Sequence, residues 1–431
     1  MPGNASENKG LAEANPAWYA AGLEHVWLPY AQMKTASLPL AVAATHGSRI
    51  VLADGRELID GIASWWTACH GYNHPHIRAA VERQLATMPH VMFGGLVHEQ
   101  ALTLARRLTG MLGPHGLDRV FFSESGSIAV EVALKMALQY WRNRGVRGRE
   151  QIVAFKGGYH GDTTGAMAVS DPQSGFHGSL AGLLPRQIIV DLPLDEASTA
   201  ALDALLAEQA ERIAAIIVEP LVQGAGGMRL HDAGVLQTLR ALADRHELLL
   251  IFDEIFTGFG RTGTMFAFEQ AGVTPDVITL SKALTGGTLP LAATVAQRKV
   301  FDAFWSDDPA KALMHGPTFM ANALACAAAN ASLDLFAREP RLAQVGRIES
   351  LLRDALEPCR KLAEVEDVRV KGATGVVELK RIENLNGLRQ RFIDEGVFVR
   401  PFSSIVYLTP AFTITEDELL KLTGAIRRVL A

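Results

Sequence analysis

The stretch Leu-Leu-Leu-Ile-Phe-Asp at 248–253, followed by Val-Ile-Thr-Leu-Ser-Lys at 277–282, indicates the fold of this chain. Each is a short apolar run that ends in polar or charged residues, which is typical of a buried parallel strand whose carboxyl end borders a ligand site. Similar runs occur at Val120–Ser123, Ile152–Phe155, Ile188–Asp191 and Ile213–Glu219, and helical patterns occur at Ala129–Trp141, Leu202–Gln209 and Val235–Asp244. This alternation predicts an α/β protein with a large, doubly wound, mostly parallel sheet.

The two ends of the chain have a different pattern. Residues His46–Asp60 predict a small β-meander around the turn Ala53-Asp54-Gly55-Arg56. From about Ala331 the pattern predicts helices at Leu342–Leu356 and Glu416–Val429 and short strands at Val368–Val370, Val376–Leu379, Val397–Val399 and Ile405–Leu408. We therefore expect residues 71–330 to form the large domain. Residues 1–70, which include an N-terminal tail, and residues 331–431 should together form a smaller α+β domain.

Composition excludes several classes of protein. The 431 residues include 41 Lys+Arg against 46 Asp+Glu, which argues against a basic nucleic-acid-binding protein, and 48% are hydrophobic, which argues against a disordered chain. Met1–Asn15 is polar and lacks the apolar core of a secretory signal. The least charged long stretch, between Lys311 and Asp334, contains Pro, Gly and Asn and is a poor membrane span. We expect a cytoplasmic protein with no membrane or nucleic-acid partner, and the histidines show no pattern of metal ligands.

Two segments at the predicted ligand edge have properties that suit an anion and an aromatic ring. Ser125-Gly126-Ser127 follows a strand and opens a long helix, so free backbone N–H groups and the positive helix end face that edge. This tripeptide fits either an ordinary N-cap or a phosphate site, and no Glu or Gln three residues later completes a capping box. After the next strand, a glycine-rich turn holds Tyr159, whose ring can stack on a ligand.

Charged residues end three of the strands. Asp253 follows five apolar residues, so its carboxylate is expected to be half-buried and to need a partner such as a protonated ring nitrogen. Lys282 follows the next apolar run, where desolvation lowers the pKa of an amine and makes it nucleophilic. Glu219 ends a third run. Each residue alone also fits a solvated cap, an ion pair or a surface lysine, but an anion site, a stacking ring, a carboxylate and a lysine together are what a pyridoxal phosphate site requires.

Several motifs resemble the class III (subgroup II) aminotransferases of fold type I, over roughly residues 25–410. The resemblance lies in Asp253-Glu254-Ile255 with the segment 257–263, and in Leu280–Gly287. Narrower motifs are Trp65-Trp66-Thr67, Ser125–Ala137, Gly158–Thr163, Gln223–Met228, His315–Met320, and Arg400-Pro401-Phe402 with Tyr407. The tandem tryptophans and the run His315–Met320 resemble the branch that aminates 8-amino-7-oxononanoate with S-adenosylmethionine in biotin biosynthesis, rather than the ornithine or 4-aminobutyrate branches.

The resemblance implies a role for each matching residue. Lys282 would bind the cofactor covalently, Asp253 would contact its ring nitrogen and Tyr159 would stack on its ring, with Glu219 and Asp162 in support. The remaining implied residues are Ser125, Gly126, Ser127, Pro317 and Thr318 for the cofactor, and Tyr30, Trp65, Trp66, Gly316, Arg400 and Tyr407 for the substrate. Because Thr318 would reach the phosphate of a neighbouring subunit, the resemblance also implies a homodimer with shared active sites.

Other interpretations remain open at this point. An ω-amino-acid:pyruvate aminotransferase would use the same scaffold, and a catalytically silent pyridoxal-phosphate-binding protein would retain part of the site. Trp65 and Trp66 fit either core or surface aromatics, or an irregular loop where both line a pocket, and Arg400 fits an ordinary salt bridge. Ala31-Gln32, Ala321 and Ala323 depart from the family pattern, so adenosylmethionine, lysine and alanine all remain candidate amino donors.

Overall fold

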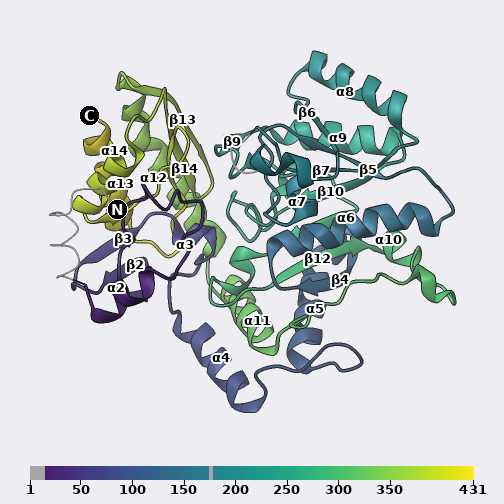
Figure 1. Ribbon diagram of the computed structural model, residues 1–431, viewed down its shortest axis with the longest axis horizontal. Coiled ribbons are helices and arrows are strands. Elements are labelled where there is room, and N and C mark those ends of the chain that lie inside the picture. Colours follow the sequence, from purple (N-terminus) through teal and green to yellow (C-terminus); the bar gives the residue numbers. More distant parts are fainter. Residues whose placement is uncertain (1–14, 174–177) are drawn as a thin grey trace.

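A seven-stranded sheet forms the centre of the protein, whose computed structural model describes residues 15–173 and 178–431 (Figure 1). Its strands are β4 (Leu117–Ser123), β5 (Gln151–Phe155), β6 (Ile188–Val190), β7 (Ile213–Val218), β10 (Leu249–Asp253), β11 (Val277–Leu280) and β12 (Ala292–Gln297), in the order β4-β12-β11-β10-β7-β5-β6. The strands from β11 to β6 pair in parallel, whereas β12 is antiparallel to both of its neighbours. The sequence predicted every strand of this sheet except β12.

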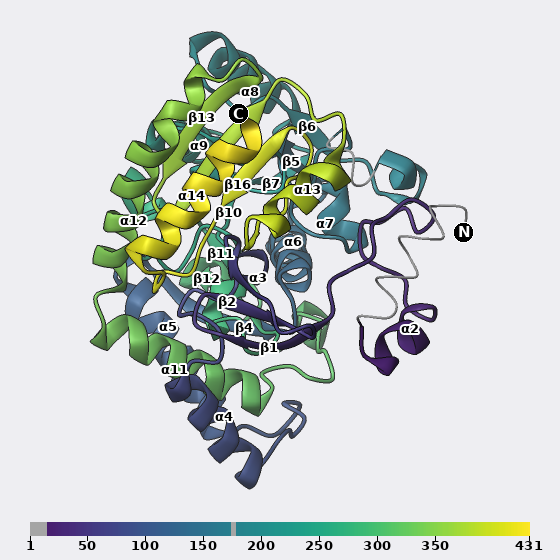
Figure 2. The same ribbon diagram turned by 90° about the vertical axis from the view of Figure 1, so that its left-hand side faces the viewer.

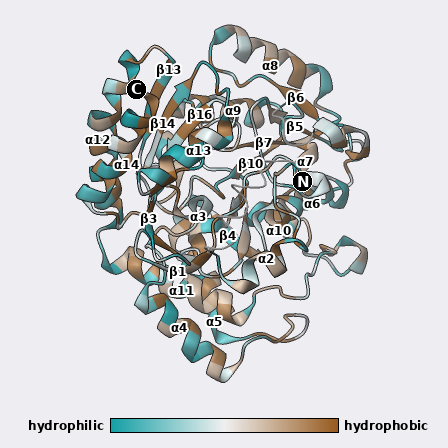
Figure 3. Ribbon diagram, turned by 60° about the vertical axis from the view of Figure 1, so that its left-hand side comes forward, coloured by the Kyte–Doolittle hydropathy of each residue, from teal (hydrophilic) through white to brown (hydrophobic). Residues whose placement is uncertain are grey.

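Helices cover both faces of the sheet, as the continuous apolar runs predicted. Ile216 and Val218 of β7 pack in the cluster that includes residues of α5 (Glu99–Leu112), α8 (Glu196–Gln209) and α9 (Ala233–Arg245). Ala215 and Ile217, on the opposite face of the same strand, pack with residues of α6 (Gly126–Asn143), α7 (Thr164–Ala168) and α10 (Arg298–Asp302). In Figure 3 the strands are mostly hydrophobic, while outer helices such as α4 (Pro75–Thr87) alternate between hydrophilic and hydrophobic residues.

Segments from the two ends of the chain form the smaller α+β part, which lies beside the large sheet (Figures 1 and 2). One sheet contains β1 (Val42–His46), β2 (Arg49–Leu52), β3 (Glu57–Asp60) and β15 (Val397–Phe398), and a second contains β13 (Val365–Lys371), β14 (Thr374–Leu379) and β16 (Ile405–Leu408). β15 pairs in parallel with β3, with Val397 opposite Ile59. The helices of this part are α12 (Arg341–Leu356), α13 (Leu385–Asp394) and α14 (Glu416–Leu430).

The remaining elements connect or flank these two parts. They are α2 (Ala17–Leu23), α3 (Ala63–Trp66), β8 (Val222–Gln223), β9 (Arg229–Leu230), α11 (Ala323–Arg338) and the short 3-10 helices Gly113–His115, Gly178–Leu183, Ala267–Ala271, Lys282–Thr285, Pro309–Lys311 and Glu357–Lys361. Helix α11 crosses residue 330, where we placed a domain boundary, and packs against α4 and α5. Most of the predicted tail, residues 1–14, lies outside the described residues. Within the described ranges, none of the helices is long and apolar enough to span a membrane.

Candidate active site

The carboxyl ends of four parallel strands and the start of α6 surround a cavity of about 150 Å³. The structure brings six of the predicted cofactor residues together in its wall: Gly126, Ser127, Tyr159, Glu219, Asp253 and Lys282. Trp66, predicted to contact substrate, also lines it. This arrangement follows from the topology, because the ends of neighbouring parallel strands meet at one edge of the sheet.

Asp253, the last residue of β10, is buried and held in place from two sides. One carboxylate oxygen accepts hydrogen bonds from Thr279 Oγ1 and from the backbone of Ile255, both at 3.1 Å. The other lies 2.7 Å from Nδ1 of His160, which is also buried. Burial opposes protonation of His160, but the hydrogen bond and charge of Asp253, with the charge of Glu219, raise the pKa of its imidazole. The contact with His160 therefore fixes the position of the Asp253 carboxylate at the edge of the cavity.

Lys282 begins a short 3-10 helix directly after β11 and Ser281, and its backbone is in the left-handed region with φ +46°. Its Nζ lies 4.3 Å from the centre of the Trp66 ring and 6.0 Å from that of Phe256. Desolvation lowers the pKa of Lys282 to about 8, although the charges of Asp253 and Glu219 oppose this shift. No described residue forms a hydrogen bond with its Nζ, so the amine remains available as a nucleophile.

Glu219 follows β7 and faces the same cavity. Its carboxylate accepts hydrogen bonds from the backbone N–H groups of Tyr159, at 3.0 Å, and Gly224, at 2.9 Å. Burial raises the pKa of Glu219 to about 7, with the negative charge of Asp253 adding to the shift and His160 opposing it. Glu219 therefore joins two loops of the site through their backbones. The neighbouring Glu254, by contrast, accepts from the backbone of Ala267 and lies outside the cavity wall.

The start of α6 retains donors for an anion. Ser125 is the N-cap, and its Oγ accepts from the backbone of Ile128 at 3.4 Å, so one donor that we expected to be free is partly used. No described residue accepts a hydrogen bond from the backbone N–H groups of Gly126 and Ser127. A Cβ on Gly161 would lie 2.1 Å from Ser127 Oγ at a φ of +125°. The approach of these two segments therefore requires glycine at this position.

Tyr159, Tyr30 and Asp162 form one polar cluster at the cavity. The Tyr159 hydroxyl donates to Asp162 at 2.9 Å and lies 3.1 Å from the hydroxyl of Tyr30, which also donates to Asp162. Burial, followed by the hydrogen bond to Asp162, raises the pKa of Tyr30 to about 12. Both phenols therefore stay protonated at neutral pH and can donate hydrogen bonds.

The tandem tryptophans lie on a left-handed turn. Residues 63–66 all have positive φ, from +46° to +76°, although none is glycine. Each such residue costs roughly 1–2 kcal/mol. Asp60 supports the turn by accepting from the backbone of Ile62 and Ser64 at 2.8 and 2.9 Å. The turn directs Trp66 into the cavity wall and leaves Trp65 38% exposed beside Tyr30, with ring centres 6.1 Å apart.

Arg400 and Tyr407 lie on the small-domain side of these tryptophans. The guanidinium carbon of Arg400 lies 4.6 Å from the centre of the Trp65 ring, and the structure shows no salt bridge from Arg400 to a described residue. Tyr407 is fully buried, with its ring 6.4 Å from that of Trp66. The simple alternative for Arg400, an internal salt bridge, is therefore wrong.

The predicted residues Gly316, Pro317 and Thr318 do not line this cavity. Gly316 and Thr318 are exposed, between Met314, which is 82% exposed, and Phe319, which is 54% exposed. A single chain therefore does not bring this loop to its own site, and the predicted role of Thr318 across a subunit interface stays a prediction.

His160 and Phe256 are among the residues of the cavity wall that received no role from the sequence. His160 belongs to a motif that we identified, but its contact with Asp253 joins residues 93 positions apart and left no local signal. Phe256 packs against Trp66 with ring centres 4.5 Å apart, and its spacing after Asp253 gave no indication of this contact.

Comparisons with known proteins agree with this geometry. The family model "Aminotransferase class-III" matches residues 30–430. The adenosylmethionine-8-amino-7-oxononanoate aminotransferase of Mycobacterium leprae is 44% identical over 414 residues, which cover 94% of this chain and 94% of that protein. The chain therefore belongs to the class-III aminotransferase family, as its motifs indicated, and it is an aminotransferase.

Solved structures resemble the whole chain. An adenosylmethionine-8-amino-7-oxononanoate aminotransferase from Methanocaldococcus jannaschii has a TM-score of 0.91 at 31% identity and covers 98% of this chain and 99% of its own. An amine transaminase from an uncultivated Pseudomonas species, in a PLP-bound form, has a TM-score of 0.86 at 34% identity and covers 94% and 98%. The predicted α/β fold of type I is confirmed.

Proposed function

We propose that this protein transfers an amino group from S-adenosylmethionine to 8-amino-7-oxononanoate, giving 7,8-diaminononanoate for biotin biosynthesis, with pyridoxal 5'-phosphate as cofactor. The observation that carries the proposal is the 44% identity to a protein of that name over 94% of both chains. The cavity supports it, because Lys282, Asp253 and the start of α6 lie together there.

The residues present fit the cofactor. The N–H groups of Gly126 and Ser127 suit its phosphate, and the carboxylate of Asp253, held by His160, suits a protonated ring nitrogen. Bound there, the cofactor supplies an aldehyde that condenses with amines and a ring that withdraws electrons from the substrate carbon. Lys282 provides the first amine, and, once the substrate amine replaces it, its Nζ moves the proton of the reacting substrate carbon.

Arg400, Trp65 and Trp66 support the choice of substrates. Adenosylmethionine and 8-amino-7-oxononanoate each carry a carboxylate, and a guanidinium that has no carboxylate partner among the described residues can bind one through two parallel hydrogen bonds. The aromatic faces suit both the sulfonium of one ligand, by cation–π attraction, and the apolar chain of the other, by burial. The same site can therefore accept the two ligands in turn, as ping-pong transfer requires.

A homodimer with shared active sites belongs to the proposal. The loop 314–319 exposes Met314 and Phe319, and its predicted cofactor residues do not line the cavity of their own chain. A contact with a second subunit would bury these two apolar side chains. In the proposed dimer, Thr318 from one subunit reaches the phosphate bound by the other. We also propose a cytoplasmic location, where the three cysteines stay reduced.

A single-turnover reaction tests the function. The cofactor-loaded enzyme is mixed with adenosylmethionine, lysine or alanine in parallel, and conversion of the cofactor to its aminated form is followed by absorbance. We expect conversion by adenosylmethionine, and formation of 7,8-diaminononanoate when 8-amino-7-oxononanoate is then added. Conversion by alanine but not by adenosylmethionine would instead assign the chain to the ω-amino-acid aminotransferases, and conversion by lysine alone would change the donor.

A further inference from the structure

Arg389, on α13, is a second half-buried arginine near Arg400 that no described carboxylate neutralises. Its Nη2 donates to the backbone oxygen of Pro401 at 2.9 Å, so its guanidinium lies against the residue that follows Arg400. Its Nε is buried and has no acceptor. Arginine is rarely removed from water without an anionic partner, so two unneutralised guanidinium groups in adjacent positions need an explanation.

Two further buried polar groups lie beside the arginines. The hydroxyl of Tyr407 and the indole nitrogen of Trp66 are buried, and apart from a weak contact with each other neither has a hydrogen-bond partner among the described residues. Their ring centres lie 6.4 Å apart, and Nζ of Lys282 lies 4.3 Å from the centre of the Trp66 ring. Burial, followed by the positive charge of Arg400, lowers the pKa of Arg389. Burial raises the pKa of Tyr407, and the positive charges of Arg400 and Arg389 oppose this rise. Unsatisfied buried donors are costly, and an anionic ligand would satisfy several at once.

We propose that Arg389 is a specificity-determining residue that, with Arg400, forms a two-arginine site for the carboxylate of the substrate. The inference rests on the proposed function and concerns its acceptor, a ketone such as 8-amino-7-oxononanoate whose carboxylate lies several carbons from the reacting carbonyl carbon. Arg400 makes the direct contact, and Arg389 adds a second positive charge in a poorly hydrated site, where charge acts strongly. Amines without a carboxylate gain no affinity from this second charge. Arg389 therefore favours substrates that carry a carboxylate over simple amines.

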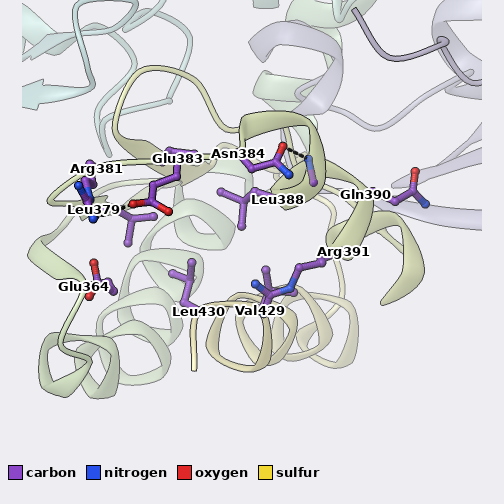
Figure 4. A pocket seen from close by; sticks show the side chains of 12 residues that line it. Glu364, Leu379, Arg381, Glu383, Asn384, Leu388, Gln390, Arg391, Val429 and Leu430 are labelled. Atoms are coloured by element: carbon purple, nitrogen blue, oxygen red, sulfur yellow. Dashed lines mark hydrogen bonds and ion pairs between the residues drawn. The ribbon is translucent and has the colours of Figure 1, made fainter. Parts of the chain in front are cut away.

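The chain offers a matched control on the same helix. Arg391 is exposed and lines a separate outer groove, which α13 and the end of α14 border (Figure 4). Arg389 is not among the residues that line that groove. Arg391→Gln therefore removes the same charge from the same helix without changing the proposed carboxylate site.

Calorimetric titration of the holoenzyme tests the proposal without requiring turnover. The probes are nonanoate and its uncharged analogue nonanamide. In Arg389→Gln we expect nonanoate to bind roughly tenfold more weakly and nonanamide to bind as in the wild type. Arg389→Lys, which keeps the charge, should retain most of the nonanoate affinity, and Arg391→Gln should match the wild type.

Three results would overturn the proposal. The first is an equal loss of affinity for nonanoate and nonanamide in Arg389→Gln, which would indicate a purely structural role. The second is an Arg389→Lys variant that binds nonanoate as weakly as Arg389→Gln does. The third is wild-type holoenzyme that binds nonanoate no more tightly than nonanamide. Failure of the proposed function would appear elsewhere, as wild-type enzyme that binds nonanoate through Arg389 but does not aminate 8-amino-7-oxononanoate.

Discussion

In the proposed mechanism, the pKa of Lys282 sets how quickly its amine condenses with the aldehyde of the cofactor at neutral pH. With a pKa of about 8, roughly one Lys282 side chain in five is a neutral amine at about pH 7.4, against about one in a thousand for a lysine of ordinary pKa 10.5. Since only the neutral amine attacks an aldehyde, burial of Lys282 should accelerate attachment on the order of a hundredfold. The attachment rate should rise with pH and level off above about pH 8.

Stopped-flow mixing of apoenzyme with pyridoxal phosphate, at a series of pH values between about 6 and 10, measures this profile. Borohydride reduction, followed by peptide mapping, identifies the modified lysine. We expect the label on Lys282 and no covalent attachment in Lys282→Ala. In Glu219→Gln the midpoint should move to lower pH, because the removed negative charge raises the pKa of the amine. This shift should stay below about one unit, since Glu219 itself titrates near pH 7.

Two results would refute this reasoning. A midpoint near pH 10 would show that desolvation does not control the amine, and an upward shift in Glu219→Gln would show that the sign of the electrostatic effect is wrong. A label on Lys135, Lys156 or Lys311 would show that the assignment of the lysine itself is wrong.

Three further substitutions test other parts of the site. Asp253→Asn should keep its circular dichroism spectrum but lose most turnover, because a neutral amide does not hold a proton on the ring nitrogen; near-normal turnover would contradict the role of Asp253. Arg400→Ala should raise the Michaelis constants of donor and acceptor together, by roughly tenfold to a hundredfold, and an effect on only one of them would argue against a shared carboxylate site. Gly161→Ala places a Cβ against Ser127 at a left-handed φ and should weaken cofactor binding in an equilibrium titration; unchanged affinity would show that the two segments can separate.

The fold was largely predictable because strong local patterns correspond to buried strands and their covering helices. β16 was predicted at its exact bounds, Ile405–Leu408, and β10 to within one residue. β12 was missed because its apolar residues follow a Gly- and Pro-containing segment and the helical spacing typical of βαβ units is absent there. Its antiparallel pairing with β4 and β11 depends on residues far apart in sequence, which no local pattern encodes.

The residues of the candidate site were predictable where a charged side chain directly follows an apolar strand. Asp253 and Lys282 satisfied that condition and lie together in the cavity wall. His160 was not assigned because its effect on Asp253 depends on a contact across the sheet. The left-handed turn at 63–66 was expected only as an irregular loop, because four ordinary residues give no sign of positive φ. Arg389 lies on a helix with charged neighbours and, from sequence alone, resembles any solvated arginine.

The pairing of β3 with β15 sets an order on how the chain can fold as it is synthesised. Val397 is made 338 residues after its partner Ile59 (397 − 59), which takes about 20–70 s at usual translation rates. Throughout that interval β3 keeps an open strand edge, while the central strands β4 to β12 can already assemble beside it. Open edges recruit other strands, so the nascent chain is most prone to aggregation just before its last 35 residues (431 − 396) are complete. A premature stop codon near the carboxyl terminus should therefore leave the proposed catalytic residues Asp253 and Lys282 in the chain and still yield an aggregation-prone product.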